Sequence, residues 1–147
     1  MDGKKIPRQY RKDVQCTKFY EWMPVVFAAA KENADSYFMV NDKQMMKLRA
    51  AAEDAGWKFH NLLVWKKPVG IPNRWYFKDC EFTLYMWRGK AKTIRIPASM
   101  QMFTAPSVLD NRHHNSQKPV SLMGHYIINS SDFSDTILDP IMGSGTT

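Results

Sequence analysis

The chain has 147 residues, a net charge of +7, hydrophobic residues at 44% of its positions and aromatic residues at 13%. This length and composition suffice for one domain with a core and exclude a fully disordered chain. No run of about twenty apolar residues is present and no apolar segment follows the basic N-terminus, so neither a membrane span nor a signal peptide is expected.

The two cysteines, Cys16 and Cys80, lie far apart in the sequence. They predict neither a disulfide framework nor a metal pair, and we therefore expect a cytoplasmic protein. The positive net charge is compatible with a polyanionic partner, because Lys and Arg displace counterions from phosphates. A basic protein without such a partner is the equal alternative on charge alone.

The first 40 residues predict an irregular N-terminal segment, followed by a helix and a strand. Residues 1–17 are polar, basic and aperiodic, and form a separate N-terminal segment. Within "YEWMPVVFAAAKEN", residues 24–32 predict a helix, since Pro24 suits a first turn or a kink. "DSYFMV" at residues 35–40 then predicts a short buried strand.

The clearest helix is predicted for "NDKQMMKLRAAAEDAG", residues 41–56. Asn41 or Asp42 can cap its start and Gly56 can end it. One face of this helix is apolar at helical spacing. The residues on that face are Met45, Leu48, Ala52 and Ala55.

The second half alternates strands with less regular segments. "WKFHNLLVWKK" (57–67) and "DCEFTLYMWRG" (79–89) predict strands, and "PVGIPNRW" (68–75) predicts the loop between them. Residues 90–116 show no strong periodicity.

The end of the chain predicts one more helix and one more strand. "QKPVSLMGHYIINSS" (117–131) predicts a helix with Pro119 in its first turn, and "DTILD" (135–139) predicts a last strand. Apolar strands that alternate with helices predict an α/β protein whose parallel or mixed sheet carries helices on both faces. Ligands of such sheets bind beyond the carboxyl ends of strands, where Asp139 lies.

The sequence closes on a glycine loop, "ILDPIMGSGTT". A phosphate-binding P-loop needs a Lys before its Ser or Thr, but Gly145 precedes Thr146. The spacing also fails the G-x-S-x-G elbow of hydrolases, and the G-x-G-x-x-G loop of dinucleotide-binding proteins usually opens a chain rather than ending one. Two interpretations remain. One is a ligand loop in which an acid, Asp139, precedes the glycines, which we call the acid-first loop; the other is a plain glycine turn after a strand.

An acid at the mouth of a loop repels phosphate and attracts an ammonium group. Glycines let the backbone approach a ligand, and exposed N–H groups favour a carboxylate. The methionine part of S-adenosylmethionine has both groups. Asp139 would therefore hold the ammonium, Gly143 and Gly145 would allow the close approach, and Thr146 and Thr147 would donate to the carboxylate.

This loop resembles the S-adenosylmethionine loop of the amino-group DNA methyltransferases, which methylate N6 of adenine or N4 of cytosine. The preceding "SQKPVSLMGHYIINSSDFSDTILDP" is similar to the segment that enters this loop in permuted members, and "FHNLLVWKKP" and "CEFTLYMWRG" resemble their later strands. The resemblance covers most of residues 18–147, which it implies to be part of a Rossmann-like methyltransferase domain of bacterial or phage type, as found in restriction-modification. The implied cofactor-binding residues are Lys118, Pro119, Asp139, Pro140, Ile141, Met142, Gly143, Ser144, Gly145, Thr146 and Thr147.

The catalytic motif of that family, [D/N/S]-P-P-[Y/F/W], does not occur in this sequence, and neither cysteine follows a proline as a cytosine-C5 mechanism requires. In the permuted order the motif would precede "YEWMPVV", on a strand beside residues 35–40. We therefore expect a piece of an enzyme that lacks this strand and does not catalyse methyl transfer alone. A second chain could supply the missing half, and Phe38 to Val40 would then wall the base pocket.

The resemblance also implies a target-recognition insert at residues 88–116 and double-stranded DNA as partner. A solvated basic loop is the plain alternative. The candidate DNA-binding residues are Lys66, Lys67, Arg74, Arg88, Lys90, Lys92, Arg95, Arg112, His113 and His114. The adjacent histidines lack further ligands at metal spacing, so no metal site is predicted.

Aromatic residues beside strands favour a core position over base stacking. They are Trp65, Trp75, Tyr76 and Trp87. Two other functions compete with the methyltransferase assignment: a DNA-binding module without catalysis, and an inactive remnant.

Overall fold

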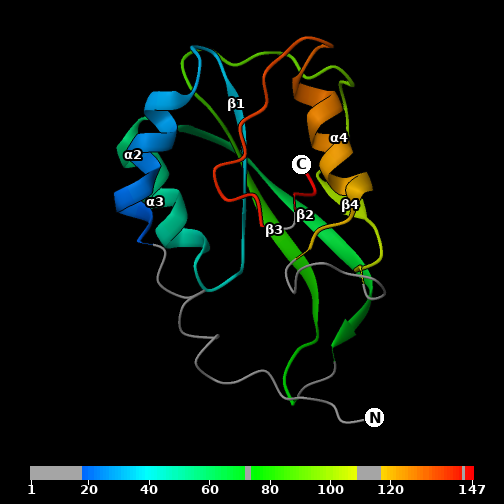
Figure 1. The fold of residues 1–147 in the computed structure, drawn as a ribbon. Coiled ribbons are helices and arrows are strands. Elements are labelled where there is room, and N and C mark those ends of the chain that lie inside the picture. Colours follow the sequence, from blue (N-terminus) through cyan, green and yellow to red (C-terminus); the bar gives the residue numbers. More distant parts are fainter. Residues whose placement is uncertain (1–17, 72–73, 109–116, 144) are drawn as a thin grey trace.

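The computed structural model describes residues 18–71, 74–108, 117–143 and 145–147. In these residues three helices and four strands form an α/β arrangement (Figure 1). In chain order they are α2 (Phe19–Ala29), β1 (Asp35–Val40), α3 (Met45–Ala55), β2 (Lys58–Ile71), β3 (Lys78–Trp87), β4 (Met102–Thr104) and α4 (Val120–Ser130).

The four strands form one mixed sheet in the order β1-β3-β2-β4. β3 is antiparallel to both β1 and β2, whereas β4 is parallel to β2. Leu84 of β3 lies between Phe38 of β1 and Leu62 of β2 in the register. β1 pairs with β3 on one side, and no strand of the described residues pairs with its other side.

Helices cover both faces of this sheet, as predicted: α2 and α3 lie on one face and α4 on the other (Figure 1). The α2/α3 face carries an apolar core built from side chains that are at most 3% exposed. Its buried members are Met23, Leu48, Ala52, Trp57, Leu84 and Met86.

The opposite face carries a second cluster, formed by Trp65, Ala105, Leu122 and Tyr126. Successive residues of β1 alternate between the faces, because strand side chains point to opposite sides. Tyr37 packs against this second cluster, whereas Phe38 packs against the α2/α3 core.

Two predicted helices are confirmed in position and one needs a correction. The cap expected at Asn41 or Asp42 is wrong, because α3 begins at Met45 with Gln44 as its N-cap. Gly56 ends α3 in the left-handed conformation (φ 110°), and Pro119 precedes the first residue of α4. The predicted helix at residues 24–32 is wrong at both bounds, since α2 begins at Phe19 and has Pro24 in its interior. The earlier start brings Met23, which is fully buried, into the core.

The strand predictions for residues 35–40, 57–67 and 79–89 are confirmed in position, but the connecting segments differ. β2 continues to Ile71, so the predicted loop is shorter. The three-residue β4 lies within the segment predicted to be irregular. "DTILD" is not a strand: Ile137 and Leu138 are 47% and 56% exposed, and no neighbouring strand of the described sheet offers hydrogen bonds there.

Candidate functional site

The acid of the glycine loop organises the loop around itself. Asp139 is half-buried, and its Oδ1 accepts a hydrogen bond from the backbone N–H of Ile141 at 3.2 Å. Its Oδ2 accepts a hydrogen bond from the Thr147 hydroxyl at 2.6 Å. A carboxylate has about four lone-pair positions, so Asp139 retains acceptor capacity for a ligand.

Both described glycines of the loop adopt the left-handed conformation, with φ of 57° at Gly143 and 69° at Gly145. A Cβ atom at Gly143 would meet only the Ile141 carbonyl oxygen, at 3.9 Å. The space beside this glycine is therefore open, and the requirement for glycine comes from the backbone angle. Gly145 N–H donates to the Met142 carbonyl at 2.9 Å, which closes the turn.

The loop is open to solvent. Ile141 and Met142 are 61% and 64% exposed, Pro140 is also exposed, and Thr146 is half-buried. Ser144 lies outside the described residues. The backbone and the Asp139 carboxylate are thus accessible to a ligand.

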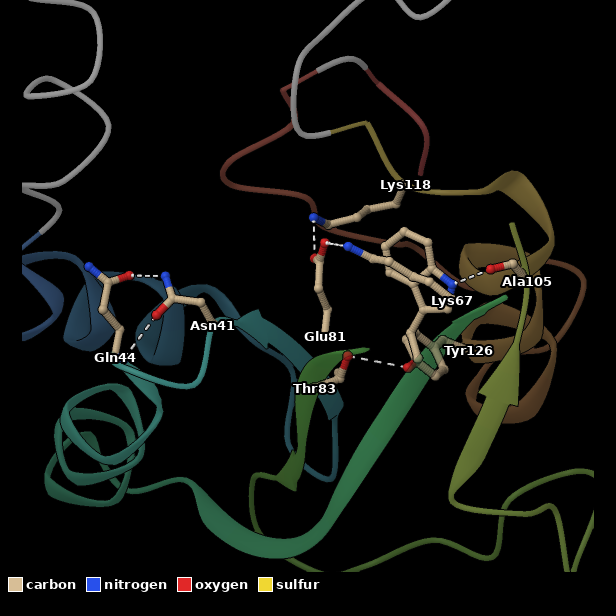
Figure 2. Close-up of polar contacts among 9 residues, drawn as sticks. Asn41, Gln44, Lys67, Glu81, Thr83, Ala105, Lys118 and Tyr126 are labelled. Atoms are coloured by element: carbon tan, nitrogen blue, oxygen red, sulfur yellow. Dashed lines mark hydrogen bonds and ion pairs between the residues drawn. The ribbon is translucent and has the colours of Figure 1, made fainter. Parts of the chain in front are cut away.

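Lys118 lies in a cluster of two lysines and one acid (Figure 2). Its Nζ donates to Glu81 Oε2 at 2.7 Å, and Lys67 Nζ donates to Glu81 Oε1 at 2.7 Å. Both ammonium groups also lie over the ring of Trp65, at 5.9 Å for Lys118 and 4.8 Å for Lys67. Trp65 is held in turn by a hydrogen bond from its Nε1 to the Ala105 carbonyl at 2.8 Å.

Glu81 is the residue that joins the two lysines. Burial alone would raise the pKa of Glu81, but the charges and hydrogen bonds of Lys118 and Lys67 outweigh it and hold the pKa below its usual value. Two positive charges and one negative charge leave this cluster with a net charge of +1. It can therefore attract an anionic group without losing its internal ion pair.

Several of the residues predicted to contact DNA have partners within the protein. Lys66 forms an ion pair with Asp79 and donates a hydrogen bond to its carboxylate. This hydrogen bond holds the pKa of the Asp79 carboxyl below its usual value. Arg88 donates to the carbonyls of Phe27 at 2.6 Å and Ala30 at 2.8 Å, at the end of α2. Arg88 thus stabilises the C-terminus of a helix, as cations do there.

The remaining candidates for DNA contact differ in exposure. Lys90 and Lys92 are exposed, and Arg95 forms an ion pair with Asp132. The Arg74 guanidinium lies 4.3 Å from the centre of the Trp75 ring. Arg112, His113 and His114 lie outside the described residues.

The family model for DNA methylases, N6_N4_Mtase, matches residues 8–147. The chain belongs to this DNA methylase family. It is 24% identical over 148 residues to the Type II methyltransferase M2.MboI of Moraxella bovis, with 87% of this chain and 54% of the relative covered. The chain thus spans about half the length of that curated relative.

Two solved structures of M1.HpyAVI are also similar. The M1.HpyAVI-SAM complex matches at 26% identity with a TM-score of 0.76, covering 88% of this chain and 67% of that one. A second M1.HpyAVI structure matches at 24% identity with a TM-score of 0.70, covering 86% of this chain and 64% of that one. These likenesses confirm the methyltransferase fold predicted for this member of the DNA methylase family.

Glu81 is a residue of this DNA methylase that the sequence analysis missed. Its signal was an acid well inside a predicted strand, between Cys80 and Phe82. The predicted core role of Trp65 is confirmed, whereas Trp75 and Tyr76 are 72% and 96% exposed. Among the described residues, no helix is long and apolar enough to span a bilayer, and no group of three or more His, Cys, Asp or Glu side chains could hold a metal ion.

Proposed function

We propose that this chain is part of a DNA methyltransferase that transfers a methyl group from S-adenosylmethionine to N6 of adenine or N4 of cytosine. Membership of the DNA methylase family supports this function. The observation that carries it is the acid-first loop, in which an accessible carboxylate lies beside two glycines with positive φ. Double-stranded DNA is the proposed substrate.

The residues of the loop fit the methionine part of the donor. Asp139 binds the ammonium through its remaining lone pairs, and the backbone at Gly143 and Gly145 approaches the ligand closely. Thr147 already donates its hydroxyl hydrogen to Asp139. Thr147 therefore serves the carboxylate only by turning away from Asp139, and this turn frees an Asp139 oxygen for the ammonium.

Lys118 and Pro119 form the second side of the donor site. The Lys118 ammonium adds positive charge near the donor carboxylate, and Glu81 with Trp65 limits where that ammonium can lie. When bound, the donor supplies an electrophilic methyl group on its sulfonium. The residues of this chain bind and orient it.

Activation of the target amine needs an acceptor beside the flipped base. The motif that provides this acceptor in the family is absent from the 147 residues, so we propose that the chain alone binds the donor without turnover. A segment with the motif, in the same polypeptide or in a second one, would complete the site next to Val40, at the side of β1 with which no strand of the described residues pairs.

The donor site is tested by calorimetric titration of the chain with S-adenosylmethionine. Asp139→Asn removes the charge that attracts the ammonium, and we expect affinity to fall about tenfold or more, as for a lost charged hydrogen bond. Asp54→Asn, on the exposed side of α3, is the matched control and leaves the affinity unchanged. No uptake of the donor, or a preference for ATP, contradicts the proposal.

A DNA-binding module without catalysis is the second candidate, because Lys90 and Lys92 are exposed on a chain of net charge +7. This candidate predicts salt-dependent DNA binding with no uptake of S-adenosylmethionine. DNA titrations at several salt concentrations, made beside the calorimetry, separate the two functions.

A further inference from the structure

A cavity of about 290 Å³ lies on the α4 face of the sheet. All four strands, α4 and the segment 91–101 line it, and no residue of the proposed donor site is among the lining residues. Its volume is close to the lower end of small-molecule pockets, roughly 300–1,000 Å³. This size suits one small ring system with a substituent.

The outer wall of the cavity is fixed by a buried amide. Asn129, only 5% exposed, accepts a hydrogen bond from Ile96 N–H with its Oδ1 at 3.2 Å and from Arg95 N–H with its backbone oxygen at 2.8 Å. Its Nδ2 donates to Ser99 Oγ at 3.3 Å. At the other end of the wall, the Gln101 carbonyl accepts from Val64 N–H at 2.8 Å, so the cavity is formed without a ligand.

A row of aromatic rings forms the floor. Tyr126 stacks on Tyr37 with centroids 4.6 Å apart, and Tyr37 stacks on Tyr85 at 5.0 Å. The row continues to His60, whose ring centroid lies 6.1 Å from that of Tyr85. It ends at Trp87, whose ring centroid lies 4.8 Å from that of His60. Tyr85 is buried, Trp87 is half-buried and His60 is exposed, so the outer rings offer a stacking surface.

The polar lining suits a ligand that combines an uncharged heterocyclic ring with an anionic group. The amides of Asn61 and Gln101 each offer donors and an acceptor, the combination that reads the edge of a nucleobase. Lys92 is an exposed ammonium at the same cavity. No Asp or Glu is among the lining residues. Burial raises the pKa of Tyr37 to about 12, so its phenol also stays uncharged.

We propose that this cavity binds one nucleotide unit, with its base stacked on His60 and Trp87, its edge at Asn61 and Gln101, and its phosphate at Lys92. The nucleotide is either free or an unpaired position of a nucleic-acid strand. Both sources present the same base and phosphate. This site is separate from the donor site and does not depend on methyl transfer.

The test measures binding of dCMP by calorimetry and of a labelled ten-nucleotide single strand by fluorescence anisotropy. Both probes, dCMP and the strand, contain only pyrimidine bases, so neither shares the adenosine of S-adenosylmethionine. His60→Ala should weaken binding about tenfold, as expected for one stacking ring. Lys92→Gln should weaken binding and reduce the slope of log affinity against log salt by about one.

Two exposed residues on other elements provide matched controls. Tyr20→Ala on α2 and Lys43→Gln before α3 remove the same kinds of side chain far from the cavity lining, and binding should not change. His60 and Lys92 are themselves exposed, so neither variant should impair folding, and thermal melting verifies this.

The outcomes identify the source of the nucleotide. Binding of dCMP that His60→Ala weakens indicates a free nucleotide, whereas such binding of the strand alone indicates a nucleic acid. No binding of either probe, or equal affinities for the His60, Lys92 and control variants, overturns the proposal. Titrating the same variants with S-adenosylmethionine separates the two proposals, because the affinity for this donor depends on Asp139 and should stay unchanged.

Discussion

The two faces of the sheet are built from different chemistry. On the α2/α3 face, Trp57 makes edge-to-face contacts with Phe27 at 5.3 Å and Phe38 at 5.4 Å, and its buried Nε1 has no hydrogen-bond partner in the described part of the chain. On the α4 face, Tyr126 donates to the buried Thr83 hydroxyl at 3.2 Å. The α2/α3 face therefore stabilises the fold by burying apolar side chains, whereas the α4 face holds polar groups in place through hydrogen bonds.

The largest expected effect comes from the apolar face. Leu84 is 1% exposed at the centre of β3, so Leu84→Ala should lower the free energy of unfolding by about 3 kcal/mol through lost burial and a residual cavity. Urea denaturation measures this change. Val69→Ala, at an 80% exposed position of β2, should change it by less than about 0.5 kcal/mol. Equal losses for the two variants would refute this view of the core.

A smaller effect is expected from the polar face. Asn129→Ala removes the side-chain partners of Ile96 and Ser99 and should lower the free energy of unfolding by about 2 kcal/mol. Hydrogen exchange should accelerate at the Ile96 amide but not at amides in α3. Ile128→Ala, at a 52% exposed position of the same helix, serves as control. Unchanged exchange at Ile96 would show that Asn129 does not fix the wall.

The smallest effect concerns Glu81, whose pKa lies below its usual value of 4.5. A lowered folded-state pKa means that the carboxylate's contribution is complete above the unfolded pKa and is lost as pH falls through the folded pKa. Glu81→Gln should therefore cost about 1 kcal/mol at pH 7, with this cost shrinking as the pH falls below 4.5 and lost once the pH is below the lowered folded-state pKa. Thermal melts across this range measure it.

The control for Glu81 is Glu53→Gln, which breaks an exposed ion pair with Arg49. Such pairs contribute little, so a change below about 0.5 kcal/mol is expected. If Glu81→Gln has the same melting temperature as the wild-type chain at pH 7, the ion pairs of Glu81 with Lys67 and Lys118 do not stabilise the fold.

Local signals in the sequence predicted much of the fold. Gly56 marks the end of α3, Pro119 marks the start of α4, and the apolar runs give three strands at the right places. Pro24 was misread, because burial of Met23 in the core outweighs the local preference of proline for a first turn.

What the sequence did not predict depends on partners distant in the chain. β4 is three residues long and exists because Trp65 of β2 lies beside it, and "DTILD" lacks such a neighbour in the described sheet. The acid-first loop was visible as a motif, and its positive-φ glycines are observed. The pairing of Lys67 and Lys118 with Glu81 joins three separate segments, and no spacing rule indicates it.

The most direct test of the donor site follows the loop itself. In ¹H–¹⁵N spectra of the labelled chain, S-adenosylmethionine should shift the amide signals of Gly143 and Gly145, and Asp139→Asn should raise the donor concentration needed for these shifts about tenfold or more. ATP at the same concentration should leave the two signals in place. Unmoved glycine signals at saturating donor, or equal shifts with ATP, would contradict the assignment of this loop.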